Sequence, residues 1–184
     1  MGKLALRGLV LLVVISVLGV GSYAIAGGGT KNFQGNLNGW QENPDISTVA
    51  TGSFEARLSQ DGSSLSYELR YSKLEGGPAS AAHVHLAKRG VNGGVSFFLC
   101  GGGSKPPCPP TTEAVVTGMV TAADVVGPTT QGIPPGAFAE ILAAMRAGRT
   151  YANVHNATFP NGEIRGQIND RRGHGNDDKD DDDD

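Results

Sequence analysis

Residues 151–168 read YANVHNATFPNGEIRGQI, which is the pattern of two short strands joined by a turn. Polar and apolar side chains alternate in residues 151–155 and again in residues 163–168, and the segment PNG at 160–162 supplies the turn. Side chains of a strand point to opposite faces in turn, so this alternation is typical of a strand with one face on a core. The stretch therefore predicts an antiparallel hairpin that carries a histidine, a carboxylate and an arginine.

Most of the chain before this hairpin repeats the pattern. Residues 64–71 alternate most clearly, and the turn at Asp61 and Gly62 predicts a hairpin with the strand before them. Other strands are expected at residues 31–37 (a first edge strand), 48–58 (with Val49 among its apolar positions), 80–87, 95–99 and 114–120.

One helix is expected, over residues 136–147. Its apolar residues Phe138, Ile141, Leu142 and Met145 follow helical spacing and would dock on a sheet. Many short strands with frequent Gly and Pro turns indicate an all-β, mainly antiparallel fold, a Greek-key-like β-sandwich or barrel with one short amphipathic helix. The only tryptophan, Trp40, is expected to pack against the core.

Both ends of the chain differ from this body. Residues 1–26 have a basic start, an apolar run and the cleavage pattern Ala-Ile-Ala, so they are predicted to be a signal peptide. The alternative is an uncleaved membrane anchor, but the apolar run is shorter than the roughly 20 residues that span a bilayer. Residues 27–30 are expected to be a flexible leader, and residues 169–184 are expected to be a disordered acidic tail.

The composition bears on location and partners. Between the terminal segments the acidic and basic residues balance, and no basic patch indicates nucleic-acid binding. The protein is expected to be secreted, periplasmic or extracellular, and to meet a membrane only transiently through its signal peptide. Cys100 and Cys108 are predicted to form a disulfide there; the alternatives are free thiols or half of a metal site.

Three histidines in the body could bind a metal. His83 and His85 are two residues apart on an expected strand, so both rings leave one face with Cα atoms roughly 6.5–7 Å apart. His155 could complete the set, and Glu42 or Glu163 could add an oxygen. Imidazole suits zinc or copper, and three histidines with an open position are common in catalytic zinc sites.

The alternative is a polar patch that binds no metal. The histidines would then form hydrogen bonds with Asn92, Asn153, Glu163 or backbone carbonyls and fix the strand register. Glu163 and Arg165 stand two apart on the last expected strand, where we expect an ion pair that orders the hairpin.

Five segments together resemble one family. They are LNGWQENP at 37–44, AHVH at 82–85, GVNGGV at 90–95, AGRTYANVH at 147–155 and GEIRGQ at 162–167. In order and spacing they resemble the CHRD domain, which is repeated in chordin and occurs singly in bacterial secreted proteins. The resemblance implies one domain over residues 31–168 and, from chordin, extracellular recognition.

Two functional hypotheses follow. The first is a secreted binding protein, not an enzyme, whose partner is an unknown extracellular protein or small ligand. The second is a metal-binding protein or metalloenzyme that uses the three histidines.

Overall fold

The computed structural model describes residues 31–170. The predicted signal peptide, the leader and the tail from residue 171 onward lie outside the described residues. The strands are β1 (Asn32–Asn38), β2 (Thr51–Leu58), β3 (Ser64–Ser72), β4 (Ala79–Leu86), β5 (Val95–Cys100), β6 (Ala114–Thr121), β7 (Thr150–Asn156) and β8 (Ile164–Asp170). The α-helix is α1 (Phe138–Arg146), and single 3-10 turns lie at η1 (Gly39–Gln41), η2 (Ala122–Asp124) and η3 (Thr129–Gln131). No helix in this part of the chain is long and apolar enough to cross a membrane.

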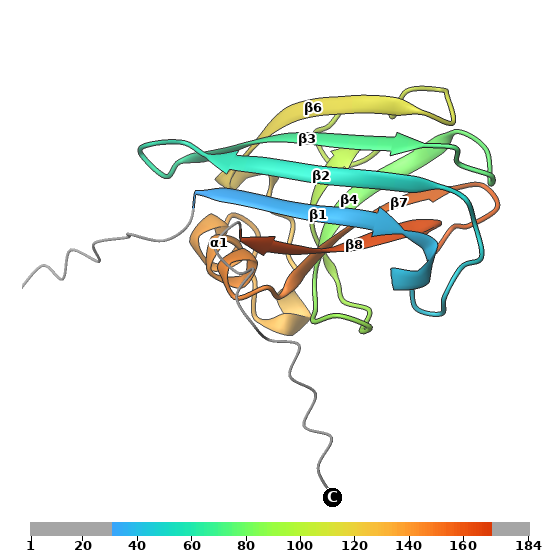
Figure 1. The fold of residues 1–184 in the computed structure, drawn as a ribbon. Coiled ribbons are helices and arrows are strands. Elements are labelled where there is room, and N and C mark those ends of the chain that lie inside the picture. The colour runs from blue at the N-terminus through green and yellow to red at the C-terminus, as the bar shows by residue number, and fades with distance from the viewer. Residues whose placement is uncertain (1–30, 171–184) are drawn as a thin grey trace, which may run out of the picture.

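The eight strands form one antiparallel sheet in the order β5-β4-β7-β8-β1-β2-β3-β6. The sheet curls into a nearly closed barrel, with β1, β2, β3 and β6 in one layer and β4, β7 and β8 behind it (Figure 1). The chain crosses between the two halves after β3, β5 and β6, which makes the topology Greek-key-like. The predicted all-β fold with one short helix is confirmed.

The barrel closes where the two ends of the sheet, β5 on one side and β6 with its neighbour β3 on the other, approach each other. The Tyr67 hydroxyl of β3 donates a 2.7 Å hydrogen bond to the Leu99 carbonyl of β5, and the Val126 amide donates to the Ser96 carbonyl at 2.9 Å. These bonds satisfy backbone groups that a sheet edge would otherwise leave open.

Three local expectations were wrong. The first strand is not at an edge, because β8, from the far end of the chain, pairs with β1 on the side away from β2. Val49 lies before β2 and is 63% exposed, because the strand begins only at Thr51. Trp40 is 64% exposed on η1 and does not pack into the core.

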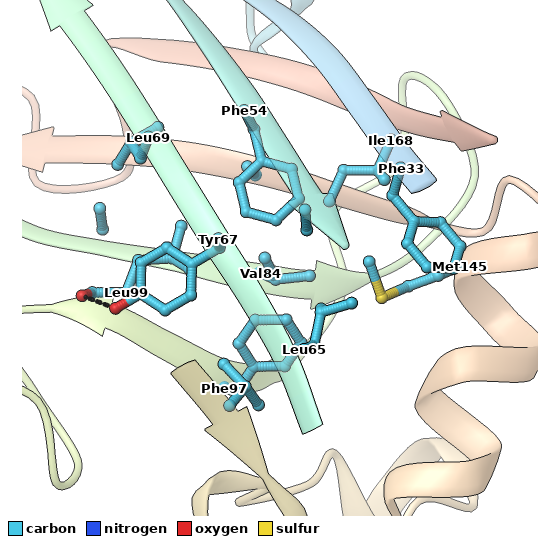
Figure 2. Close-up of a cluster of buried hydrophobic side chains, with 14 of the residues drawn as sticks. Phe33, Phe54, Leu65, Tyr67, Leu69, Val84, Phe97, Leu99, Met145 and Ile168 are labelled. Atoms are coloured by element: carbon cyan, nitrogen blue, oxygen red, sulfur yellow. Dashed lines mark hydrogen bonds between the residues drawn. The ribbon is translucent and has the colours of Figure 1, made fainter. Parts of the chain in front are cut away.

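The core fills the space between the two layers. Figure 2 shows aromatic and aliphatic side chains from both halves meeting there, and Phe33, Phe54 and Phe97 are each at most 1% exposed. Burying a phenylalanine of this kind contributes about 1.5–3 kcal/mol. Met145 of α1 lies beside Phe33 and Ile168 (Figure 2), so the helix covers one end of the barrel with the apolar stripe that its spacing predicted.

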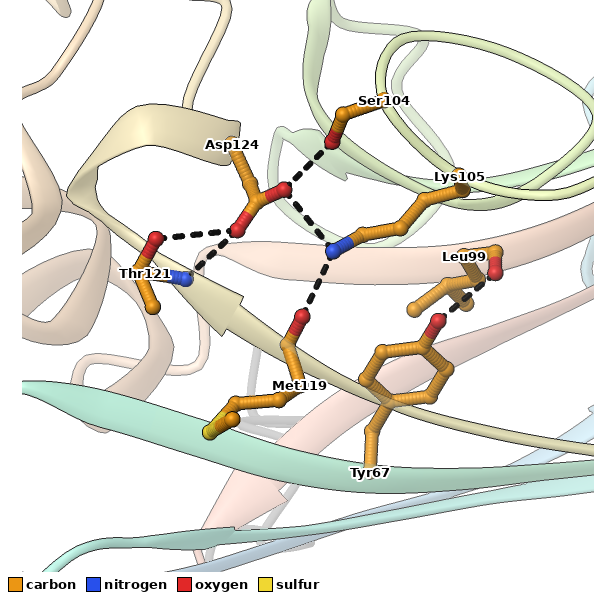
Figure 3. Close-up of polar contacts among 7 residues, drawn as sticks. All are labelled: Tyr67, Leu99, Ser104, Lys105, Met119, Thr121 and Asp124. Atoms are coloured by element: carbon orange, nitrogen blue, oxygen red, sulfur yellow. Dashed lines mark hydrogen bonds and ion pairs between the residues drawn. The ribbon is translucent and has the colours of Figure 1, made fainter.

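The predicted disulfide between Cys100 and Cys108 is present, and its loop is fixed to η2 by a largely buried ion pair (Figure 3). The Lys105 ammonium lies 2.8 Å from an Asp124 carboxylate oxygen, with side chains only 11% and 14% exposed. Asp124 also accepts hydrogen bonds from the Ser104 hydroxyl and from the backbone and side chain of Thr121. This network ties the loop between β5 and β6 to the end of β6.

Asp124 should make the fold acid-sensitive. Partial burial acts to raise the pKa of Asp124, but hydrogen bonds from Lys105, Ser104 and Thr121 outweigh it and hold the pKa below its usual range. A depressed folded-state pKa gives stability that is present above the unfolded value, about 3.9, and lost as the pH falls through the folded value. In urea titrations we expect Asp124→Asn to cost about 2 kcal/mol at pH 7 and progressively less below pH 4.

The exposed Asp45 provides the control. Asp45→Asn should change stability by less than about 0.5 kcal/mol. An Asp124→Asn cost that stayed constant from pH 7 down to pH 2 would contradict the proposed linkage.

Candidate functional site

One outer face of the barrel is polar and yet buried. β7 is buried along its whole length: Ala152 and Val154 face the core, while Tyr151, Asn153 and His155 point to the opposite side. Neighbouring strands β4 and β8 add their own polar side chains to this outer face. A polar sheet face is normally solvated, so its burial here needs a cover.

The cover is made by two segments, residues 39–44 and residues 87–94, which are locked together. The Asn43 side chain donates to the Gly90 carbonyl at 2.8 Å, and the Asn92 side chain donates to the Asn43 carbonyl at 2.9 Å. From β8 the Arg165 guanidinium donates to the carbonyls of residues 88 and 91 and to the Asn92 side chain. Arg165 is only 1% exposed, so it acts as an internal anchor for this cover.

The strand register brings the three histidines together on this face. His83 of β4 lies opposite Asn153 of β7, and His85 lies opposite Tyr151, so His155 is the diagonal neighbour of His83. The centre of the His83 ring lies 4.6 Å from the centre of the His85 ring and 4.3 Å from that of the His155 ring. One ring nitrogen from each of the three lies within 4.8 Å of the others. The structure thus brings together the three predicted histidines.

Backbone carbonyls set the tautomers of two of these rings. His85 Nδ1 lies 2.8 Å from the Gly93 carbonyl oxygen, and His155 Nδ1 lies 3.0 Å from that of Pro160. A carbonyl can only accept, so both Nδ1 atoms carry the proton and both Nε2 atoms present a lone pair. His85 Nε2 lies 2.6 Å from His83 Nδ1, whereas His155 Nε2 is buried without a partner.

The surroundings keep the imidazoles neutral. Burial lowers the pKa of His83 to about 3 and that of His155 to about 4, and the neighbouring imidazoles act in the same direction. Burial also lowers the pKa of His85. Neutral imidazole is the form that binds metal ions, so at pH 7 the site is ready for one without first losing protons.

Glu42 lies next to the cluster but outside the group of candidate ligand atoms. It is 6% exposed, and burial raises the pKa of its carboxyl to about 7 against the opposing effects of Arg165 and Asn153. Its Oε1 atom is buried and has no hydrogen-bond partner. Glu42 Oε1 and the side-chain nitrogen of Asn153 both lie against the backbone at Gly162.

Glu163 is not part of the histidine cluster, and it does not form the expected ion pair with Arg165. Its carboxylate accepts hydrogen bonds from the Thr48 hydroxyl, from the amides of residues 75 and 76, and from the Asn156 side chain. Arg165 instead binds the cover and stacks on Tyr151. Glu163 precedes β8 at the turn, where the alternation of the strand does not hold, so the two side chains do not share a face.

Tyr151 was not among the site residues predicted from the sequence. Its ring is stacked parallel to His85, with centres 4.7 Å apart, and the Arg165 guanidinium carbon lies 3.4 Å from the centre of the same ring. Tyr151 is therefore packed between a histidine and a cation, which fixes the orientation of His85. The spacing of Tyr151, Asn153 and His155 on one strand face could have indicated it.

The backbone carbonyls of Gly93 and Pro160 were also missed. They belong to loops, where the direction of a carbonyl depends on the fold and leaves no trace in residue type.

The comparisons with known proteins agree with this architecture. The family model of the CHRD domain matches residues 33–168, from β1 to β8, and this range includes all three histidines. Searches of curated proteins and of solved structures found no match. Because the matched range covers more than half of the chain, the resemblance seen in the sequence is confirmed and the chain belongs to the CHRD domain family.

Proposed function

We propose that this CHRD domain binds one transition metal ion, zinc or copper, through His83, His85 and His155. The observation that carries the proposal is His155 Nε2, a lone pair that is buried without a hydrogen-bond partner beside two other imidazoles. Leaving such an atom unsatisfied costs free energy, and a metal ion would supply the missing partner.

The hydrogen bonds made by the other ring nitrogens support this interpretation. Metal-binding histidines commonly donate their other ring N–H to a backbone carbonyl or carboxylate, which fixes the tautomer and the ring orientation. His85 and His155 have this arrangement with Gly93 and Pro160. The backbone contacts that the metal-free interpretation expected are thus present, but they use Nδ1 and leave Nε2 for a ligand role.

The spacing fits one ion after small ring rotations. Two nitrogens at about 2.0–2.1 Å from a tetrahedral zinc ion stand roughly 3.4 Å apart. The close pair of His83 Nδ1 and His85 Nε2, at 2.6 Å, would have to open slightly while the His83 proton between them moves to the other ring nitrogen of His83. The widest separation, within 4.8 Å, would have to narrow. Imidazole ligands favour zinc or copper over calcium or magnesium, which prefer oxygen.

We further propose that the protein acts outside the cytoplasm. The signal-peptide pattern of residues 1–26 supports export, and family membership and the disulfide between Cys100 and Cys108 are consistent with it. Recognition of an extracellular partner, as in chordin, stays a prediction.

Metal content tests the proposal directly. The chain, purified without a histidine tag, stripped with a chelator and dialysed against zinc(II) or copper(II), should hold about one ion per molecule. His83→Ala and His155→Ala should each reduce this to near zero by elemental analysis. His174→Ala, in the acidic tail beyond the described residues, is the control and should retain the ion.

Two outcomes would contradict the proposal. One is a wild-type protein that stays free of metal although it is folded. The other is an ion that survives in folded His155→Ala, since its ligands would then lie elsewhere.

A further inference from the structure

We infer that the side-chain oxygen of Asn153 is a fourth ligand of this site and that Glu42 positions the amide for that role. The inference rests on the proposed function, which names only the three histidines.

Asn153 stands where a fourth ligand is needed. It lies on the same outward face of β7 as His155, two residues away, and directly opposite His83 in the neighbouring strand. The residue is 2% exposed, and its Oδ1 atom is buried without a hydrogen-bond partner. Buried amide oxygens nearly always have a partner, so this atom needs an explanation.

Gly162 reveals which way the amide points. A Cβ atom at this glycine would lie 2.3 Å from Glu42 Oε1 and 2.9 Å from Asn153 Nδ2, so both atoms abut the same backbone position. The amide nitrogen is therefore on the Glu42 side. The amide oxygen is left for the opposite side, that of the histidines.

The cluster contains more lone pairs than N–H groups to satisfy them. Each neutral imidazole has one N–H, and those of His85 and His155 are used on backbone carbonyls. Only the N–H of His83 remains, and it faces His85 Nε2. His155 Nε2 and Asn153 Oδ1 are left without a donor, so a cation between these atoms would satisfy what the protein does not.

The donor set narrows the choice of metal. Three imidazole nitrogens and one amide oxygen form a borderline-to-hard set, which suits zinc(II) or copper(II) better than copper(I), an ion that favours thiolate and thioether ligands. The expected occupant is therefore a divalent ion.

Substitutions at Asn153 separate a ligand from a structural amide. Asn153→Ala should weaken zinc(II) binding about 10–100-fold in competition with a chelator and should shift the visible absorption bands of the cobalt(II)-loaded protein. Asn153→Asp keeps an oxygen at the same place and adds a charge, so it should bind zinc(II) at least as tightly as wild type. A purely structural amide would not be rescued in this way, because the aspartate would face the Glu42 carboxyl without a donor.

Asn38→Ala is the matched control. Asn38 lies on β1 opposite Arg165, and its Oδ1 is also buried and unpartnered, but it does not lie beside the histidines. This variant should leave zinc(II) affinity and the cobalt(II) spectrum unchanged.

The outcomes distinguish the two proposals. Wild type that binds neither zinc(II) nor cobalt(II) would remove the metal function itself. Wild type that binds, together with an Asn153→Ala variant of equal affinity and identical spectrum, would overturn only the role of Asn153. Should Asn153→Ala fail to fold, weaker binding by a folded Asn153→Asp variant would have the same consequence.

Discussion

Glu163→Gln should destabilise the protein by about 3–5 kcal/mol, although it changes one atom of a buried side chain. Glu163 is fully buried, and each carboxylate oxygen accepts two hydrogen bonds. Oε1 receives the Thr48 hydroxyl and the Glu75 amide, each at 2.7 Å, and Oε2 receives the Gly76 amide and the Asn156 side chain. Hydrogen bonds to a charged acceptor are about twice as strong as neutral ones.

The glutamine cannot satisfy this arrangement in either orientation. Its NH2 group would face two donors, one of them a backbone amide that can only donate, and that amide would be left buried without an acceptor. The effect should extend beyond the hairpin, because Glu163 ties the turn before β8 to segments around residues 48 and 75.

Urea denaturation followed by circular dichroism measures the effect. Glu68→Gln is the control, since Glu68 pairs with Arg70 on the surface, where ion pairs contribute at most about 1 kcal/mol. Equal unfolding midpoints for wild type and Glu163→Gln would show that the buried carboxylate does not hold these segments together.

Arg165→Met should destabilise the fold by about 2–4 kcal/mol and loosen the cover segment that contacts His85. The guanidinium satisfies two backbone carbonyls and the Asn92 side chain, and methionine fills much of the volume without any donor. The Gly93 carbonyl, which orients His85, belongs to the same segment. If the metal function is correct, zinc(II) affinity should therefore fall about 10–100-fold.

Hydrogen exchange locates this effect. The amides of residues 88–94 should exchange faster in Arg165→Met, while β2 and β3 should change much less. Arg57→Met, at an exposed position of β2, removes an arginine from the surface and should leave exchange in residues 88–94 as in wild type. Unchanged exchange of this segment in Arg165→Met would show that the cover is held by other contacts.

Most strands and the helix could be predicted because their signals are local. The alternation of β3 and the spacing of Phe138, Ile141 and Met145 in α1 depend on residues a few positions apart, and burial follows both patterns. The disulfide between Cys100 and Cys108 was predictable for a similar reason, because only one pairing of two cysteines is possible.

The errors concern features decided by distant segments. β1 looked like an edge strand, but β8 arrives from more than 100 residues away to pair with it. Glu163 looked like a partner of Arg165 because of strand spacing. Its donors come from residues 48, 75, 76 and 156, which only the closed barrel brings to it.

The candidate site also combines features that depend on nearby residues with features that depend on distant segments. The sequence by itself determined that His83 and His85 share a face, because a strand repeats every two residues. Only the tertiary structure decided that His155 and Asn153 join them, since this depends on the register between β4 and β7. The directions of the lone pairs were decided there too, because backbone carbonyls of two loops fix the ring tautomers, and the position of a loop carbonyl depends on packing across the whole barrel.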